Sequence, residues 1–192
     1  MEKNAVIEFF NRLAPEWDAD MERNEDVIRT ILDNACVLEG ADVLDVACGT
    51  GVLFPDYLAR RVGSLTGIDI SPEMAKRAKA KYPEVTVIAG DAEEYPFERE
   101  FDVVMIYNAF PHFPDPARAV EKLARLVKKG GRFSIAHGMS RDAINAHHSG
   151  AARDVSNGLL EADELAALFE PWYDVDVVIS DDRMYQVAGT KR

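Results

Sequence analysis

Short apolar runs alternate along the chain with segments in which apolar residues recur at every third or fourth position. The apolar runs predict five β-strands, at residues 43–46, 65–70, 85–89, 101–107 and 132–137. The run at 101–107 is nearly continuous, which is typical of a strand buried on both faces. Strands that alternate with helices favour a parallel sheet with helices on both faces, so we expect an α/β fold.

Helices are predicted where the apolar spacing changes to three and four residues. Two of them precede the first strand, at residues 4–14 and around 27–32. Ser71-Pro72 and Asp115-Pro116 each combine a capping side chain with a proline suited to the first turn, so each predicts a helix start. The second of these helices is expected to end at Gly130-Gly131.

The last third of the chain is less regular. Residues 138–160 show no clear period, and a final helix is predicted around residues 165–169. Two closing strands are predicted at 174–180 and 184–190, with Asp181-Asp182 in the turn between them. This closing pair would bring one antiparallel strand into the sheet.

The turn after the first predicted strand carries the candidate chemistry. Residues 47–51 contain Gly49 and Gly51, which allow the backbone to approach a ligand closely. Ligands of open α/β sheets bind beyond the carboxyl ends of the strands. The dinucleotide fingerprint G-x-G-x-x-G is absent, because Ala47 stands at the first glycine position. Asp45 would repel a pyrophosphate but suits a cationic ligand such as S-adenosylmethionine, which carries an ammonium and a sulfonium.

Four segments, in order, resemble the class I S-adenosylmethionine-dependent methyltransferases, nearest to the type 11 subgroup around the ubiquinone and menaquinone C-methyltransferases. These segments are Asp45–Gly51, Leu65–Ser71, Gly90–Glu93 and Phe101–Asn108. The resemblance is close over residues 40–137. It implies a Rossmann-like, doubly wound sheet of seven mostly parallel strands with one antiparallel strand. It also implies methyl transfer from S-adenosylmethionine, with S-adenosylhomocysteine as the product.

The resemblance further implies the residues of the cofactor site. Asp45 would hold the methionine ammonium, and Asp69 at the end of the second strand would accept both ribose hydroxyls. Asp91 would accept the adenine amino group. The other implied contacts are close backbone approach at Ala47, Gly49 and Gly51, packing of Ile70 against adenine, the Ala92 N–H, and Asn108 at the sulfonium end.

The acceptor side rests on residues that follow the fourth and fifth strands. In-line methyl transfer chiefly needs a positioned nucleophile, and a base is required only when that nucleophile carries a proton. We therefore rank Asn108, His112, His137 and His147 as the substrate-facing candidates, with His148 as the neighbour of His147. Each histidine stays open between a proton acceptor and an ordinary packed or solvated residue. We expect no metal site.

Composition narrows the class of partner. The chain has 192 residues and a formal charge of −12, whereas a nucleic-acid binder needs a basic footprint. No apolar run reaches 18 residues, and we expect neither a secretory leader nor a disulfide framework from the two cysteines. We expect a cytoplasmic protein with a small-molecule substrate, no nucleic acid and no membrane insertion, and either a monomer or a homodimer.

These observations predict a single methyltransferase domain with three parts. An N-terminal helical lid at 1–39 would close over a cofactor-binding core at 40–137, followed by a variable substrate segment with closing strands at 138–192. Phe9, Phe10 and Trp17 belong either to that lid or to an ordinary helix core. Two rival functions stay open: a module that binds S-adenosylmethionine without catalysis, and an NAD-dependent oxidoreductase. The acceptor molecule and its reacting atom are undetermined.

Overall fold

The computed structural model describes residues 1–19, 21–148 and 152–192. Within these residues, seven strands form one sheet in the order β3-β2-β1-β4-β5-β7-β6. The strands are β1 (Asp42–Val46), β2 (Ser64–Asp69), β3 (Thr86–Ala89), β4 (Phe101–Tyr107), β5 (Val127–His137), β6 (Tyr173–Ser180) and β7 (Tyr185–Lys191). Neighbouring strands are parallel except at β7, which is antiparallel to both β5 and β6. The expected mostly parallel sheet with one antiparallel strand is confirmed.

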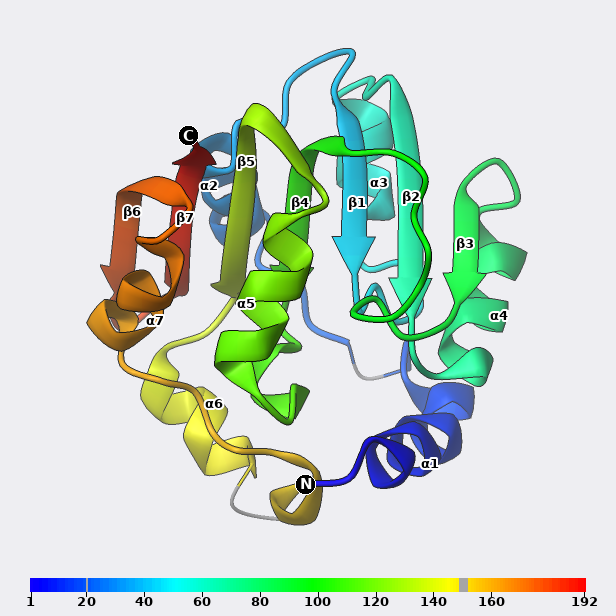
Figure 1. Cartoon of the computed structure of the whole chain (residues 1–192). Helices are drawn as coiled ribbons and strands as arrows, with labels where there is room; N and C mark the ends of the chain where they lie inside the picture. The colour runs from blue at the N-terminus through cyan, green and yellow to red at the C-terminus, as the bar shows by residue number, and fades with distance from the viewer. Residues whose placement is uncertain (20, 149–151) are drawn as a thin grey trace.

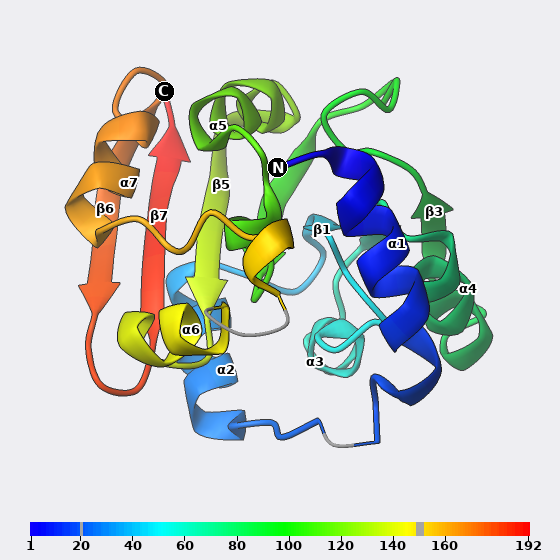
Figure 2. The same cartoon turned by 90° about the horizontal axis from the view of Figure 1, so that it is seen from below.

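Helices cover both faces of this sheet and its carboxyl edge (Figure 1). Helices α2 (Glu25–Asn34), α3 (Phe54–Ala59) and α4 (Pro72–Lys81) pack on one face, and α5 (Pro116–Ala124) and α7 (Ala162–Phe169) pack on the other. Helices α1 (Lys3–Leu13) and α6 (Arg141–His148) lie across the carboxyl ends of the parallel strands, as the view from below shows (Figure 2). Short 3₁₀ turns are η1 (Ala14–Glu16), η2 (Phe110–His112) and η3 (Arg153–Val155). No helix in the described ranges is both long and apolar enough to cross a membrane.

Each face of the sheet has its own apolar core, because successive residues of a strand point to opposite faces. Leu44 and Val46 of β1 belong to the core beneath α5 and α7. Val43 belongs to the core on the other face, together with Phe54 of α3. The same alternation places the side chain of Asp45 on the Val43 side of the sheet.

Both predicted helix starts are confirmed. The Ser71 hydroxyl oxygen accepts a hydrogen bond from the Met74 N–H at 3.2 Å, and the Asp115 carboxylate accepts one from the Arg118 N–H at 3.0 Å. Such caps satisfy N–H groups that the first turn of a helix leaves unpaired. Because Ser71 follows β2 almost directly, its cap determines where the chain turns at the end of that strand.

The predicted end of the helix at Gly130-Gly131 is wrong. Helix α5 ends at Ala124, and β5 already begins at Val127, so both glycines lie inside a strand. The register of β5 against β4 is irregular in this stretch. A Cβ on Gly131 would stand 2.8 Å from the Asp102 carbonyl oxygen. Gly131 therefore permits close approach of two strands at a bulge, which the sequence pattern does not distinguish from a helix cap.

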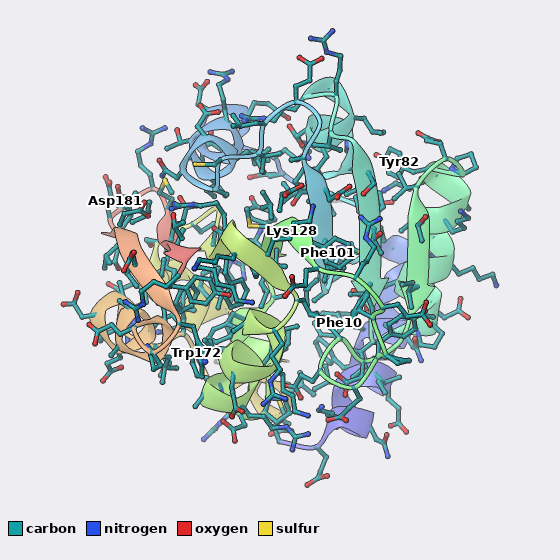
Figure 3. All side chains as sticks on the ribbon, turned by 45° about the horizontal axis from the view of Figure 1, so that its top comes forward. Phe10, Tyr82, Phe101, Lys128, Trp172 and Asp181 are labelled. Carbon is teal, nitrogen blue, oxygen red and sulfur yellow. The ribbon has the colours of Figure 1, made fainter. Side chains whose placement is uncertain are left out.

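The amino ends and the carboxyl ends of the strands differ in what packs against them. At the amino ends of the strands, the ammonium of Lys128, labelled in Figure 3, lies 2.9 Å from an Asp42 oxygen and 3.1 Å from an Asp102 oxygen. At the carboxyl ends, residues 138–160 contribute α6 and η3, and η3 packs against α1.

The predicted division of the chain into a lid at 1–39, a cofactor-binding core at 40–137 and a substrate segment at 138–192 stays a prediction.

Candidate active site

A cavity of about 370 Å³ lies at the carboxyl ends of β1 to β4. Its wall consists of residues that end or follow these strands, namely 46–50, 68–70, 90–93, 107–109 and 112–114. Helix α1 and the segment after it add Lys3, Val6, Phe10 (labelled in Figure 3), Trp17 and residues 21–23, and Val52 and Met74 complete the wall. The volume falls within the range of small-molecule and cofactor sites, about 300–1,000 Å³.

The turn after β1 is shaped by three residues in the left-handed region, with φ of 54° at Ala47, 55° at Gly49 and 84° at Gly51. A Cβ on Gly49 would meet its nearest neighbour, the Trp17 indole nitrogen, at 3.9 Å, so the space in front of Gly49 is open. A Cβ on Gly51 would stand 2.7 Å from the Phe54 ring. Gly49 therefore opens the cavity, whereas Gly51 lies outside the cavity wall and makes room for Phe54.

Asp69, at the end of β2, is buried and belongs to the cavity wall. Its Oδ2 accepts the Gly49 N–H at 2.8 Å, and its Oδ1 accepts the Ser71 N–H at 2.8 Å. Burial raises the pKa of Asp69 to about 6, although these two hydrogen bonds act in the opposite direction. Each carboxylate oxygen has a second lone pair, so the group can also accept hydroxyl donors from the cavity.

Asp45 lies behind the turn and outside the cavity wall. It is 1% exposed, and its Oδ2 has no hydrogen-bond partner among the described residues. Burial raises the pKa of Asp45 well above its ordinary value, and the nearby Asp69 carboxylate raises it further. Asp45 is therefore a buried acid on the face of the sheet that the strand alternation dictates, and its predicted contact with the cofactor stays a prediction.

The turn after β3 brings two acids to the cavity. Asp91 Oδ1 accepts the Glu93 N–H at 3.0 Å, which closes the turn. The ammonium of Lys3, the first residue of α1, lies 2.6 Å from Asp91 Oδ2 and 2.5 Å from Glu93 Oε2. Ile70 and Ala92, both predicted as cofactor contacts, line the same cavity.

Asn108 directly follows β4 and is held in the left-handed region, with a φ of 54°. Its N–H donates to the Ala136 carbonyl oxygen at 2.9 Å, and its Oδ1 accepts the Gly138 N–H at 2.9 Å. These bonds lock Asn108 to the end of β5. Asparagine tolerates this backbone conformation better than most residues, and Asn108 lines the cavity.

His112, in η2, also lines the cavity. Its Nδ1 lies 2.7 Å from the Val155 carbonyl oxygen, and a carbonyl oxygen only accepts, so Nδ1 carries the hydrogen. In the neutral ring the lone pair is then on Nε2. The Phe10 ring stands edge-on to the imidazole, with 4.8 Å between centroids. The contact with Val155 joins the loop after β4 to η3.

The other two predicted histidines lie elsewhere. His137 ends β5 and is 1% exposed, with its ring 6.0 Å from that of Tyr185, its pairing partner on β7. His147 is exposed on α6. Neither belongs to the cavity wall, and the side chain of His148 lies outside the described residues. In the described part of the chain, no group of three or more His, Cys, Asp or Glu residues is arranged to hold a metal.

Several wall residues were missed by sequence reasoning, notably Lys3, Arg23, Glu93 and Tyr107. Tyr107 precedes Asn108 and Glu93 follows Ala92, so the predicted positions of these neighbours indicated that both residues lie near the site. Lys3 gave none, because 88 residues separate it from Asp91. Of the three N-terminal aromatic residues, Phe10 and Trp17 line the cavity and stand edge-to-face at 5.7 Å, whereas Phe9 packs on Phe10 outside the wall.

Comparison with known proteins finds a matching family model and several proteins that are similar in sequence. The family model described as "Methyltransferase domain" matches residues 44–135. A ubiquinone biosynthesis O-methyltransferase of Paracidovorax citrulli is 37% identical over 144 residues, which cover 66% of this chain and 58% of that protein. A demethylmenaquinone methyltransferase of Paenarthrobacter aurescens is 33% identical over 137 residues, covering 68% of this chain and 54% of that protein. The chain thus spans little more than half the length of these relatives.

Solved structures share the fold. The N-methyltransferase NodS of Bradyrhizobium japonicum, in complex with S-adenosylhomocysteine, matches with a TM-score of 0.76 at 11% identity, over 96% of this chain and 97% of that one. The magnesium protoporphyrin IX methyltransferase of Synechocystis, with bound S-adenosylhomocysteine, matches with a TM-score of 0.73 at 15% identity, over 100% of both chains. At these identities the likeness establishes the Rossmann-like fold alone.

Proposed function

We propose that the chain, whose residues 44–135 match the methyltransferase-domain family, is an S-adenosylmethionine-dependent enzyme that methylates a small-molecule acceptor. The observation that carries this proposal is the buried carboxylate of Asp69, held by the Gly49 and Ser71 N–H groups in the cavity wall. An acid at the end of the second strand of such a sheet is an acceptor for ribose hydroxyls.

The rest of the cavity fits the other parts of S-adenosylmethionine. The open space in front of Gly49 suits the methionine part, close to the turn after β1. Ile70 offers an apolar surface for adenine, and Asp91 and the Ala92 N–H offer polar partners for its edge. The contact between Asp45 and the methionine ammonium stays a prediction, because Asp45 lies behind the turn.

The bound cofactor supplies an electrophilic methyl carbon, so the main task of the protein is to position the acceptor and exclude water. In the proposed mechanism Asn108, locked to the end of β5, orients the acceptor. His112 accepts the proton of a hydroxyl acceptor at Nε2, while its Nδ1–H stays bonded to Val155. Phe10 and Trp17 shield the cavity from solvent. We assign no substrate contact to His137 or His147.

The proposed acceptor is a small, largely apolar molecule with a phenolic or quinol hydroxyl. The part of the cavity wall that the N-terminal segment supplies includes aromatic and apolar residues such as Phe10, Trp17 and Met21. A relative named as a ubiquinone biosynthesis O-methyltransferase supports a hydroxyl acceptor, and one named as a demethylmenaquinone methyltransferase supports a quinone-type molecule. The formal charge of −12 disfavours a nucleic-acid acceptor. A cytoplasmic location, and the choice between monomer and homodimer, stay predictions.

The test is calorimetric titration of S-adenosylmethionine, S-adenosylhomocysteine and NADH into the wild-type chain and Asp69→Ala. We expect the first two to bind the wild type and to lose at least 100-fold in affinity in the variant, because two hydroxyl donors lose a charged acceptor. Asp163→Ala, an exposed acid in the first turn of α7, is the matched control and should bind like the wild type.

Binding of NADH alone would contradict the proposal and favour the oxidoreductase. A chain that binds S-adenosylmethionine but forms no S-adenosylhomocysteine with catechols, naphthoquinols, thiols or amines would instead favour a non-catalytic binding module.

A further inference from the structure

Lys3 joins helix α1 to the turn after β3 across a long stretch of sequence. Its ammonium lies 2.6 Å from Asp91 Oδ2 and 2.5 Å from Glu93 Oε2, at sequence separations of 88 and 90 residues. All three side chains belong to the cavity wall. They meet at the end of the cavity that the proposed function assigns to adenine, away from the reacting methyl group.

Among Lys3, Asp91 and Glu93, the Glu93 carboxylate is the most buried acid, so it gains most from a nearby positive charge. Its side chain is 3% exposed, and its Oε1 has no hydrogen-bond partner among the described residues. A buried carboxylate is unfavourable unless it is paired. Arg118 of α5 is farther away, with 3.9 Å between its Nε and Glu93 Oε2. Lys3 therefore supplies the nearer positive charge, and it comes from a helix that covers the cavity.

Helix α1 is anchored at both ends against the proposed cofactor turns. Near its C-terminal end, Asn11 Oδ1 accepts the Ser71 hydroxyl at 2.7 Å, beside the cap that follows Asp69. At its first residue, Lys3 reaches the turn after β3. A lysine in the first turn opposes the helix macrodipole, so Lys3 does not favour the helix itself. Its stabilising contacts are the two acids.

Lys3 is also held firmly as a cation. Burial lowers the pKa of Lys3, but the hydrogen bonds and charges of Asp91 and Glu93 outweigh this and raise the pKa above its ordinary value. Asp91 is in turn fixed on both oxygens, by Lys3 at Oδ2 and by the Glu93 N–H at Oδ1. The orientation of this carboxylate therefore depends on α1 being in place.

We propose that Lys3 is a positioning residue for the cofactor: it closes α1 over the adenine end of the site and fixes the Asp91 carboxylate that accepts the adenine amino group. This inference rests on the proposed function and adds a residue outside the four segments that resemble the family.

The test compares calorimetric binding of S-adenosylhomocysteine and adenosine to the wild-type chain and three variants. Lys3→Met should raise the Kd of both ligands about tenfold, the scale expected for losing charge-assisted contacts. Adenosine lacks the methionine part, so an equal effect on it locates the loss at the adenine end. Lys3→Arg should restore the Kd to within about threefold. Lys129→Met, an exposed lysine near the start of β5, is the matched control and should change neither Kd.

Hydrogen exchange of α1 separates this role from a general effect on stability. In the wild type, S-adenosylhomocysteine should slow exchange in residues 3–13. Lys3→Met should lose this protection while exchange in the central strands of the sheet stays slow, even though the unpaired Glu93 carboxylate lowers its urea midpoint. Equal Kd values and equal protection in the wild type and Lys3→Met would overturn the inference while leaving the proposed function intact. Failure of the wild type to bind S-adenosylhomocysteine would overturn both.

Discussion

The carboxyl edge of the sheet has two halves that differ in how directly the sequence places their residues. The turns after β1, β2 and β3 bring most of the predicted cofactor contacts to the cavity, namely Ala47, Gly49, Asp69, Ile70, Asp91 and Ala92. In the half that follows β4 and β5, Asn108 and His112 line the cavity, whereas His137 and His147 lie outside its wall. A residue directly after a buried parallel strand is placed by the register of that strand. A residue on a later helix, or paired with the antiparallel strand, depends on long-range packing.

The largest effects on stability and binding should come from Gly49 and Gly51 in the turn after β1. Substitutions there test whether one glycine serves the fold and the other serves ligand binding. Gly51→Ala should lower the free energy of unfolding by about 2–4 kcal/mol, because a Cβ there meets the Phe54 ring at a φ of 84°. Gly49→Ala should lower it by about 1–2 kcal/mol, since only the positive φ is unfavourable, but it should reduce S-adenosylhomocysteine binding at least 100-fold. Urea denaturation and titration measure the two effects, and equal stability losses would remove the distinction.

The pH dependence of the first half follows from Asp69. Its pKa of about 6 lies above the ordinary value of 3.8, so the stability it contributes is fully present below pH 4 and is lost as pH rises through 6. The pH-dependent contribution of Asp69 to the free energy of unfolding is roughly 3 kcal/mol. It is measured as the difference between the pH–stability curves of the wild type and Asp69→Asn.

Cofactor binding should have the opposite sign, because the ionised form accepts the ribose hydroxyls. Affinity for S-adenosylhomocysteine should fall up to about tenfold for each pH unit below 6. An affinity that is flat between pH 5 and 8 would contradict a role for the ionised carboxylate.

Substitutions of His112 test the half of the site that follows β4, where this residue is the proposed proton acceptor. His112→Asn and His112→Ala should both lower kcat about 100-fold with a catechol acceptor, because both remove the proton acceptor. His112→Asn retains an N–H donor that can face the Val155 carbonyl oxygen, so it should be the more stable of the two. The Kd of S-adenosylhomocysteine should change less than twofold in either variant. Wild-type kcat in both would exclude His112 as the base.

The smallest effect should come from Ala47, whose φ of 54° is unfavourable for a residue with a Cβ. Ala47→Gly should raise the free energy of unfolding by up to about 1 kcal/mol. Ala5→Gly, at an exposed position inside α1, is the control of opposite sign and should lower it by about 1 kcal/mol. Destabilisation by both variants would mean that the turn after β1 is not strained at Ala47.

Local signals predicted much of the fold and part of the candidate site. The capping side chains of Ser71 and Asp115, each followed by a proline, mark helix starts, and the run at 101–107 matches β4 in its bounds. The misplaced helix end at Gly130-Gly131 shows where local signals stop, because the same glycines serve a strand bulge against Asp102. The difference between a cap and a bulge depends on a neighbouring strand that lies far away in the sequence.

The sequence by itself determined the alternation of strands and helices, the turns after the strands, and the acids and glycines that those turns carry, because these depend on residues within a few positions of one another. The tertiary structure alone decided which of these side chains share a cavity. It buried Asp45 outside the cavity wall, placed the His137 ring beside that of Tyr185 on β7, and brought Lys3 to Asp91 and Glu93. Antiparallel pairing and the docking of α1 are set by packing across the whole domain, and a contact between residues 88 positions apart leaves no local pattern in the sequence.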